Sequence, residues 1–420
     1  MADDIEVYID FAPGLKRVGT LYRTPYRTPQ RGAETVSFEY HPDWLQEGVR
    51  FSLEPALTLN RGTFTPPKGY PIFGSIGDSA PDTWGRRLMQ RAERRLADRE
   101  KRAVRTLMEA DYLLGVSDIS RLGALRFRRS GEEPFQSPSR SGVPGHVELG
   151  RLLQITERIL RDEETDEDLQ MIFAPGSSLG GARPKASVID QHGHLSIAKF
   201  PKETDDYSIE TWEAIAMRLA ERAGIRTPEH QLVQVAAKPV LVSERFDRAG
   251  STRIPFLSAL SMMGLKDGDH GSYPELVDVL TQHGAQATID AHELYRRMVF
   301  NVLISNVDDH LRNHGFLWMG RGGCALSPAF DLNPTPIDVR PRILSTNINL
   351  DEGTCDLDLV LSAAEYFGLG SQGAKGIIKE VAKVTATWRD VAVSYEVRQE
   401  EIHRMESAFE HDDLRKALAQ

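Results

Sequence analysis

Alternation of apolar and polar residues dominates the first part of the chain and predicts β-strands, because successive side chains of a strand point to opposite faces. The segments with this pattern are EVYID (5–9), VGTLYR (18–23) and ETVSFEY (34–40). A helix is predicted from about Pro81, in PDTWGRRLMQRAERRLADRE, and DISRLGALRFRR (118–129) predicts a closing strand. Residues 1–129 are therefore expected to form an N-terminal β-rich subdomain.

The pattern changes after this subdomain. Residues 130–145, SGEEPFQSPSRSGVPG, are rich in Ser, Pro and Gly and predict a linker. Residues 146–250 follow with a helix and then a strand, a glycine loop, a second strand, a helix and a third strand. Apolar spacing in 251–420 is mostly helical, for example in 361–369 and 376–409. The whole pattern predicts an α+β fold.

Bulk composition narrows the class of protein. The chain has 420 residues, 40% of them hydrophobic, and a net charge of −10, as in a globular protein of two or three domains. A surface this acidic does not bind polyanions as a whole, and Glu93, Asp98 and Glu100 interrupt the arginine-rich helix. Two cysteines, Cys324 and Cys355, indicate a reducing compartment. With no signal-like or membrane-spanning apolar run, a cytoplasmic protein without a membrane partner is expected.

A glycine loop is the first candidate for chemistry. APGSSLGGARPKASVI (174–189) contains Ser177, Ser178, Gly180 and Gly181, and then Lys185. Glycines let backbone N–H groups approach a phosphate closely, although the loop lacks the Walker A pattern. The loop alone is equally consistent with a flexible turn.

A lysine on the next predicted strand strengthens this phosphate hypothesis. Lys199 ends HLSIAKF (194–200), and a lysine on a rigid strand beside a glycine loop suits nucleotide phosphates. A surface lysine is the alternative. Glu213, in a predicted helix over 208–225, could pair with Lys199. The match of Ser196–Lys199 to S-x-x-K lacks the companion motifs of β-lactamases.

The densest polar cluster interrupts an apolar stretch, NVLISNVDDHLRNHGFLW (301–318). Asp308 and Asn313 form D-x-x-x-x-N, the spacing of a protein-kinase catalytic loop. A carboxylate there can accept a hydroxyl proton, and an amide oxygen can bind Mg²⁺. Asp331, in AFDLNPTP, follows as a second metal ligand. The pattern predicts a catalytic loop that leaves a buried helix.

Other interpretations of the cluster are weaker. His310 and His314 have zinc-helix spacing, but HLRNH lacks the glutamate of H-E-x-x-H and a third ligand. Asp308 or Asp309, taken singly, could cap a helix or form a turn. Linear order favours the kinase: glycine loop, lysine, helical glutamate, LVSERF, D-x-x-x-x-N and then aspartate.

At these residues the sequence resembles the HipA family, the kinase toxins of bacterial HipBA-type toxin–antitoxin modules. The resemblance covers roughly residues 5–400. Its motifs are PDTWGRRLM (81–89), LGALRF (122–127), SSLGGARPKA (177–186), IAKFP (197–201), LVSERFDR (241–248), NVDDHLRN (306–313) and AFDLNP (329–334).

The resemblance implies a two-lobed, protein-kinase-like (HipA-like) fold with the N-terminal β-rich subdomain added. Residues 146–250 would form the N-lobe and 251–420 the helical C-lobe. It also implies a serine/threonine kinase that uses ATP and Mg²⁺, with Asp308 as base, Lys199 and Arg312 as further catalytic residues, and Asn313 and Asp331 on the metal. ATP-binding positions would be Ser178, Gly180, Gly181, Lys185, Lys199, Glu244, Phe246 and His310, with Glu244 and Phe246 at the adenine hinge.

The resemblance further implies regulation and partners. Ser178, or alternatively Ser177, would be autophosphorylated, because a phosphoserine of charge about −2 cannot share the loop with ATP phosphates. The partners would be a HipB-like helix-turn-helix antitoxin, operator DNA mainly through that antitoxin, and a protein substrate such as an aminoacyl-tRNA synthetase.

The sequence also departs from the family pattern, which leaves the protein substrate open. Arg312 stands where lysine is common, and Asp331-Leu332-Asn333 replaces a more acidic triplet. The alternatives are a small-molecule or lipid kinase on a related scaffold, and a catalytically silent co-repressor subunit of a DNA-binding antitoxin complex. The filled catalytic positions disfavour the silent subunit.

Overall fold

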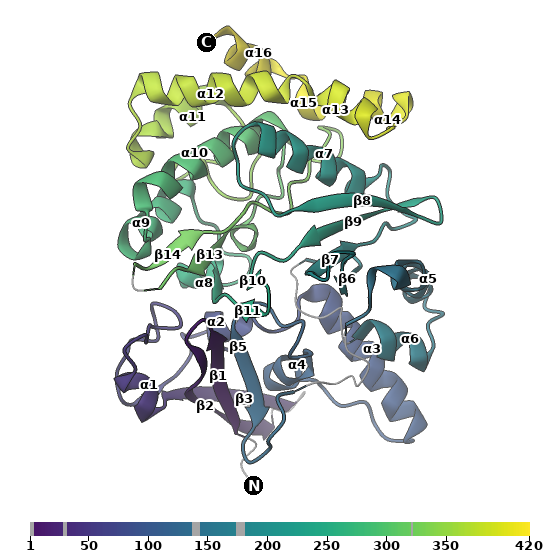
Figure 1. Cartoon of the computed structure of the whole chain (residues 1–420), viewed down its shortest axis with the longest axis vertical. Helices are drawn as coiled ribbons and strands as arrows, with labels where there is room; N and C mark the ends of the chain where they lie inside the picture. The colour runs from purple at the N-terminus through teal and green to yellow at the C-terminus, as the bar shows by residue number, and fades with distance from the viewer. Residues whose placement is uncertain (1–3, 28–31, 137–142, 174–180, 321) are drawn as a thin grey trace. The chain divides into compact units, whose positions relative to one another are not determined.

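The computed structural model describes residues 4–27, 32–136, 143–173, 181–320 and 322–420. The chain divides into two compact units (Figure 1). The first unit comprises residues 1–202 and 233–257, and the second comprises 203–232 and 258–420. The four-part division at 129, 145 and 250 that the sequence suggests stays a prediction.

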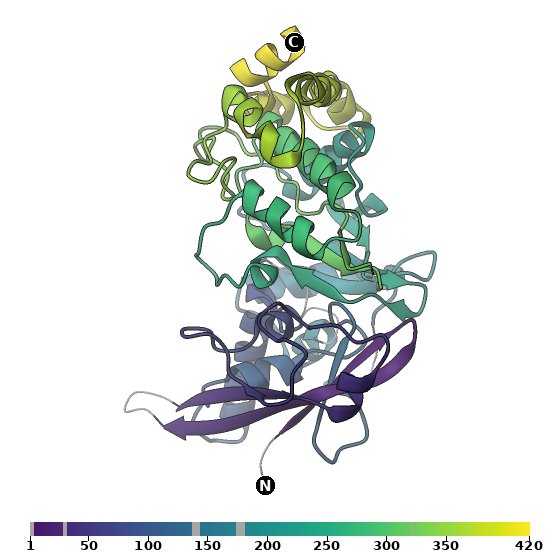
Figure 2. The ribbon, with the colours of Figure 1, turned by 90° about the vertical axis from the view of Figure 1, so that its left-hand side faces the viewer.

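An antiparallel sheet of order β4-β3-β2-β1-β5 opens the first unit. Its strands are β1 (Ile5–Phe11), β2 (Gly14–Arg27), β3 (Gly32–Tyr40), β4 (Thr63–Phe64) and β5 (Leu125–Arg129). Figure 2 shows β2 and β3 running side by side as a long ribbon, in register from Gly19↔Tyr40 to Arg27↔Gly32. The alternating segments of the sequence lie within these strands, because their apolar positions form one buried face.

The helices of the first unit are α1 (Pro42–Gln46), α2 (Gly74–Gly77), α3 (Thr83–Arg99), α4 (Glu109–Gly115), η1 (His146–Glu148), α5 (Leu149–Leu160) and α6 (Asp166–Phe173). Helix α3 begins at its cap Asp82, whose Oδ1 accepts a hydrogen bond from Gly85 N at 2.7 Å. Its arginines lie beside carboxylates: Arg86 pairs with Glu109 and Arg91 with Glu164. Carboxylates therefore neutralise part of the arginine-rich face of α3.

A second antiparallel sheet has the order β6-β7-β9-β8. Its strands are β6 (Lys185–Ile189), β7 (Leu195–Lys199), β8 (His230–Val235) and β9 (Lys238–Glu244), and the short strands β10 (Arg248–Ala249), β11 (Thr252–Arg253) and β12 (Phe256–Ser258) follow. Leu152 and Leu153 of α5 share a core with Val188, Ala198 and Val242 of the sheet. In β7 the buried face carries Ser196 and Ala198, whereas Lys199 is half-buried.

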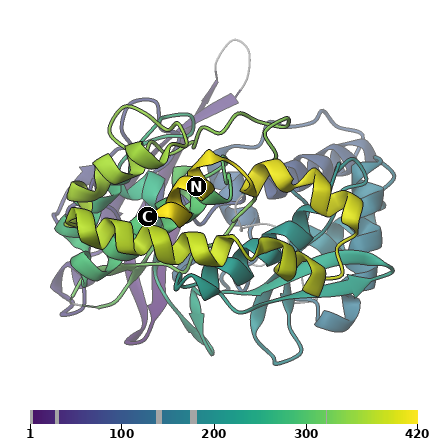
Figure 3. The same ribbon diagram turned by 90° about the horizontal axis from the view of Figure 1, so that it is seen from above.

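The second unit is mostly helical. Its elements are α7 (Ile209–Arg222), α8 (Ala259–Met262), α9 (Tyr273–His283), α10 (Ala287–Leu303), η2 (Leu311–Asn313), β13 (Gly315–Trp318), β14 (Cys324–Leu326), α11 (Leu357–Ser362), η3 (Ala363–Phe367), α12 (Ser371–Thr385), α13 (Trp388–Ser394), α14 (Gln399–Arg404), α15 (Glu406–Phe409) and α16 (Asp412–Ala419). Figure 3 shows the C-terminal helices lying over α10 and α7, and both helices contact α12. Trp388 stacks on Phe409 with ring centroids 4.7 Å apart.

Mixed helices and antiparallel sheets confirm the predicted α+β class. Within the described part of the chain, no helix combines the length and apolar character needed to cross a bilayer.

Candidate active site

The predicted catalytic loop leaves the C-terminus of the buried helix α10, as the sequence indicates. Ser305 adopts a left-handed backbone with φ of 52°, and its hydroxyl donates to Ala408 O at 2.8 Å. The loop then forms the short helix η2 and enters strand β13. A non-glycine residue with positive φ costs free energy, so the turn at Ser305 is held by its surroundings.

Asp308 faces solvent at the start of this loop. Its side chain is 53% exposed, and Arg340 Nη1 lies 2.9 Å from its Oδ1. Its backbone carbonyl accepts hydrogen bonds from His310 N at 2.9 Å and from Asn313 Nδ2 at 3.1 Å. The loop therefore joins the backbone of the candidate base to the side chain of the candidate metal ligand and leaves the Asp308 carboxylate accessible.

Asn313 and Asp331 supply the donor atoms that Mg²⁺ prefers. Because Asn313 Nδ2 is used by the Asp308 carbonyl, its amide oxygen is the atom left for a cation. Asp331 lies in the same unit and has a left-handed backbone, with φ of 56°. Strained backbone at a carboxylate is typical of functional sites. An amide oxygen and a carboxylate fit a magnesium ion, although no grouping of three or more His, Cys, Asp or Glu side chains that could hold a metal occurs among the described residues.

The next residue, Asp309, is buried instead of exposed. Its Oδ1 lies 2.9 Å from His314 Nε2, and its other oxygen accepts the Tyr273 hydroxyl. Burial by itself would raise the pKa of Asp309, but His314 and the Tyr273 hydrogen bond hold that pKa below its usual value. Burial and Asp309 together raise the pKa of Tyr273 well above its usual value. His314 thus contacts a carboxylate within the loop.

Arg312 is engaged by another residue of the second unit. Its Nε and Nη2 lie 2.6 and 3.0 Å from the carboxylate oxygens of Asp267, in an exposed pair. Arg340 contacts Asp308. A catalytic role for Arg312 stays a prediction.

The predicted nucleotide-binding residues of the first unit lie on its second sheet and the adjoining loop. Lys185 Nζ is 3.1 Å from Asp82, and each side chain is only 4% exposed. Gly181 has φ of 90°, and a Cβ there would lie 3.0 Å from Lys185 Nζ, so glycine is required. Gly181 O also accepts Trp84 N at 3.3 Å, which ties the end of the glycine loop to the start of α3.

Lys199 lies opposite Lys185 in the β6–β7 register. Glu244 ends strand β9, and its Oε2 is 3.4 Å from His194 Nδ1. The ring of Phe246 lies 6.1 Å from that of Phe256. Ser177, Ser178 and Gly180 lie outside the described residues. Because the first unit carries these positions and the second carries Asp308, His310, Asn313 and Asp331, their assembly into one site stays a prediction.

Sequence reasoning missed a buried charge cluster inside LVSERFDR. Asp247 accepts from Arg245 Nε at 2.8 Å, from Arg248 Nη1 at 2.6 Å and from Gly123 N at 2.7 Å. Arg245 Nη1 also donates to Ser120 O at 2.5 Å. The motif therefore has a structural role, fastening β9 to the segment before β5. The close spacing R-x-D-R is its sequence signal, but the carbonyl partners lie too far along the chain to be inferred.

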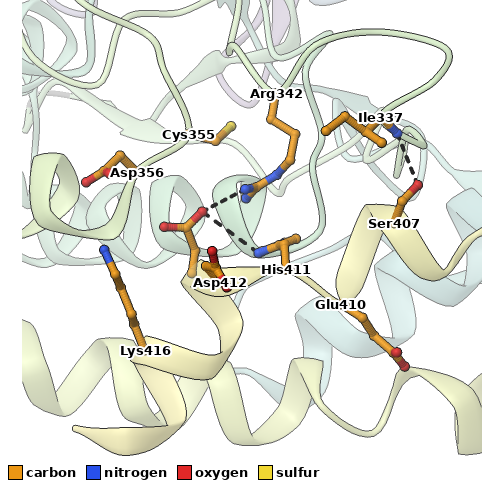
Figure 4. A pocket seen from close by; sticks show the side chains of 10 residues that line it. Ile337, Arg342, Cys355, Asp356, Ser407, Glu410, His411, Asp412 and Lys416 are labelled. Atoms are coloured by element: carbon orange, nitrogen blue, oxygen red, sulfur yellow. Dashed lines mark hydrogen bonds and ion pairs between the residues drawn. The ribbon is translucent and has the colours of Figure 1, made fainter.

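A pocket of about 490 Å³ lies within the second unit (Figure 4). Its lining residues are Ile337, Arg342, Cys355, Asp356, Ser407, Glu410, His411, Asp412, Asp413 and Lys416. Arg342 Nη1 pairs with Asp413 at 2.7 Å, and its Nε and Nη2 donate to Ser305 Oγ and Val302 O, both at 2.9 Å. Arg342 thus connects the pocket wall to the base of the loop.

Comparison with known proteins gives matches over most of the chain. The HipA-like C-terminal domain family model matches residues 177–388. A Haemophilus influenzae protein named "Putative kinase" is 25% identical over 197 residues, covering 41% of this chain and 56% of that protein. The Sinorhizobium fredii "Putative kinase Y4dM" is 34% identical over 139 residues, covering 29% of this chain and 33% of that protein. The chain thus spans only about half and a third of these two relatives.

A further relative and a solved structure match over greater lengths. The Sinorhizobium fredii "Putative kinase Y4mE" is 23% identical over 344 residues, which cover 73% of this chain and 74% of that protein. A chain from the Shewanella oneidensis MR-1 toxin–antitoxin complex of HipA, HipB and operator DNA has a TM-score of 0.68 at 17% identity. It covers 99% of this chain and 96% of that chain, so the predicted HipA-like fold is confirmed.

Proposed function

This chain belongs to the HipA family, and from that premise we propose that it is an ATP- and Mg²⁺-dependent serine/threonine protein kinase acting as the toxin of a type II toxin–antitoxin system. The observation that carries the proposal is the asymmetry of the catalytic loop. Asp308 presents an exposed carboxylate, while Asn313 binds its carbonyl and Asp309 is buried. A solvent-facing base beside an amide oxygen ligand is the arrangement that phosphoryl transfer to a hydroxyl requires.

In the proposed reaction a serine or threonine hydroxyl of the substrate approaches Asp308. The hydroxyl proton passes to the carboxylate, the oxygen forms a bond to the γ-phosphorus of ATP, and the bond to the β-phosphate oxygen breaks. Asn313 and Asp331 would hold Mg²⁺, which supplies neutralisation of phosphate charge when bound. Lys199, Lys185, Gly181, Glu244, Phe246 and His310 would hold the nucleotide. Arg340 holds Asp308 Oδ1 at 2.9 Å, which orients the carboxylate.

The proposal extends to regulation and partners. Ser178, or alternatively Ser177, would accept phosphate from the enzyme itself and thereby exclude ATP from the loop. The similar Shewanella oneidensis complex contains HipB and operator DNA. By analogy, we infer a HipB-like helix-turn-helix antitoxin as partner, contact with DNA mainly through that antitoxin, and a translation component such as an aminoacyl-tRNA synthetase as substrate.

The test is phosphopeptide mass spectrometry and steady-state transfer with Mg²⁺–ATP, comparing Asp308→Asn with Asp338→Asn. Asp338 is a matched control, because its side chain is 62% exposed and its Oδ1 is 2.6 Å from Arg404. We expect Asp308→Asn to lower transfer by about 10²–10⁴-fold and Asp338→Asn to leave it unchanged. An Asp308→Asn variant with near wild-type transfer would overturn the assignment, and transfer only to metabolites would favour a small-molecule kinase.

A further inference from the structure

Two adjacent aspartates of the catalytic loop lie in opposite environments. The Asp308 side chain is 53% exposed, whereas Asp309 is 2% exposed. The backbone carbonyl of Asp309 is also fixed, because it accepts hydrogen bonds from Thr346 Oγ1 at 2.6 Å and Thr346 N at 3.0 Å. A buried carboxylate one residue from the candidate base therefore anchors this part of the loop.

The anchor of Asp309 has two sides. On one side, His314 Nε2 lies 2.9 Å from Oδ1, and His314 directly follows the candidate metal ligand Asn313. On the other side, the hydroxyl of Tyr273, at the start of α9, donates to the second oxygen. Tyr273 is fully buried, so neither contact competes with water.

A chain of hydrogen bonds continues from Tyr273 to the segment that contains Asp331. Asn301 Nδ2 donates to the Tyr273 oxygen at 3.0 Å, and Asn306 Nδ2 donates to Asn301 Oδ1 at 3.0 Å. Asn333 N donates to Asn306 Oδ1 at 3.1 Å. All the hydrogen bonds of this series run in one direction, toward the Asp309 carboxylate. The dipoles of the donor groups therefore add, and each hydrogen bond strengthens its neighbours.

We propose that Asp309, His314, Tyr273, Asn301 and Asn306 act as one buried brace that sets Asp308, Asn313 and Asp331 in mutual register. The inference rests on the proposed kinase function. These five are positioning residues, since each is at most 3% exposed. The brace contacts the residue after Asp308, at Asp309, the residue after Asn313, at His314, and the second residue after Asp331, at Asn333. A shift of about 1 Å at such residues costs about 10²-fold in rate.

The experiment compares Tyr273→Phe with Tyr295→Phe in the full chain. Both tyrosines are fully buried in the second unit, and the Tyr295 hydroxyl donates to Val360 O at 3.2 Å, outside the brace. We expect Tyr273→Phe to lower kcat by about 10- to 100-fold, to raise the Mg²⁺ concentration for half-maximal rate, and to leave the ATP KM within about twofold. Tyr295→Phe should change only the melting temperature.

Hydrogen–deuterium exchange supplies a readout that does not depend on catalysis. Tyr273→Phe should speed exchange in peptides covering 306–314 and also in those covering 331–335, whereas Tyr295→Phe should leave both unchanged. Asn306→Ala interrupts the series of hydrogen bonds between Tyr273 and Asn333. It should speed exchange in 331–335, while the contacts of Asp309 with His314 and Tyr273 remain.

The outcomes separate the two proposals. Equal kcat for Tyr273→Phe and Tyr295→Phe, or faster exchange in only one of the two segments, would overturn the brace. If the wild-type protein transfers no phosphate, the proposed kinase function fails, and the exchange measurements still decide whether the two segments are joined.

Discussion

Asp247 in the first unit and Asp309 in the second are both almost completely buried, and the two carboxylates are held in different ways. Asp247, in the first unit, is 1% exposed and is paired with the guanidinium groups of Arg245 and Arg248. Asp309, in the second unit, is held by Tyr273 and His314. Burial by itself raises the pKa of both carboxyls, yet the surrounding donors lower both pKa values below normal. Two guanidinium groups hold the first carboxylate, and a hydroxyl and an imidazole hold the second.

The difference matches what each site does. Arg245 and Arg248 also donate to the carbonyls of Ser120 and Arg121, so the first cluster joins the segment after β9 to the segment before β5. Burial lowers the pKa of Arg248 to about 9, with Asp247 opposing that shift, so both partners stay charged at neutral pH. Because the charges persist, the ion pairs of Asp247 do not weaken around neutral pH. The second cluster aligns a loop, and hydrogen bonds with a defined direction serve that purpose better.

The largest expected effect comes from breaking the first cluster. Asp247→Ala leaves Arg245 and Arg248 buried without a counter-charge, and we expect the free energy of unfolding to fall by about 3–5 kcal/mol. Urea unfolding followed by circular dichroism measures the loss, with the exposed Asp338→Ala as a control that should match the wild type. A loss below about 1 kcal/mol would show that the cluster contributes little.

Lowering the pH tests the second unit in another way, because the largely buried imidazole of His411 lines its pocket. Burial, and then Arg342, lower the pKa of His411 from 6.5 to about 4. In the unfolded chain this imidazole binds a proton below pH 6.5, whereas in the folded chain it does so only below about pH 4. The free energy of unfolding is therefore highest above pH 6.5 and falls as the pH is lowered from 6.5 to 4. This pKa shift corresponds to a loss of about 3 kcal/mol in the free energy of unfolding.

His411→Asn should flatten that pH dependence. His411 caps α16 by accepting from Leu414 N at 3.3 Å, and asparagine can also cap a helix but does not titrate. The measurement is unfolding free energy at a series of pH values for both proteins. An unchanged slope between pH 6.5 and 4 in the variant would exclude His411 as the group responsible.

A smaller effect is expected at Asp309. Asp309→Asn retains one acceptor oxygen but places an NH₂ group against either Tyr273 or His314, which should cost about 1.5–3 kcal/mol. Urea unfolding measures it beside Asp247→Ala. If Asp309→Asn destabilises more than Asp247→Ala, the contrast between fixed cations and directional donors is wrong.

The smallest effect concerns Asp308, the exposed neighbour of Asp309. Arg340→Gln removes an ion pair whose side chains are 57% and 53% exposed. Solvent screens such a pair, so the free energy of unfolding should change by less than about 1 kcal/mol. Unfolding at low and high salt checks this, and a larger, salt-independent loss would place Arg340 among the residues that hold the fold.

Much of the fold could be predicted from the sequence, because its signals are local. The alternating runs lie within β1, β2 and β3, and the predicted helix over 208–225 corresponds to α7 (Ile209–Arg222), whose cap is Ser208. The stretch 376–409 was expected to be helical, and the structure divides it among α12 to α15. Helix α12 packs on α10 and α7, and α13 packs on α7, and such contacts leave no periodicity in the sequence.

The candidate site was predictable only in part. D-x-x-x-x-N located Asp308 and Asn313 because both lie in one loop. Tyr273 and Arg340 could not be found, since their contacts with Asp309 and Asp308 join distant positions of the chain. Lys185 was expected at the nucleotide, and its contact with Asp82 depends on where α3 begins.

The bonds that fix the base of the catalytic loop have a consequence for synthesis on the ribosome. Ser305 donates to the carbonyl of Ala408, 103 residues later, and Arg342 joins Ser305 to Asp413 in α16. At about 5–20 residues per second, translation needs about 5–20 s to supply these contacts after the loop has been made. A nascent chain therefore carries its catalytic loop without these contacts during that interval, and the base of the loop reaches its final geometry only after α16 has left the exit tunnel.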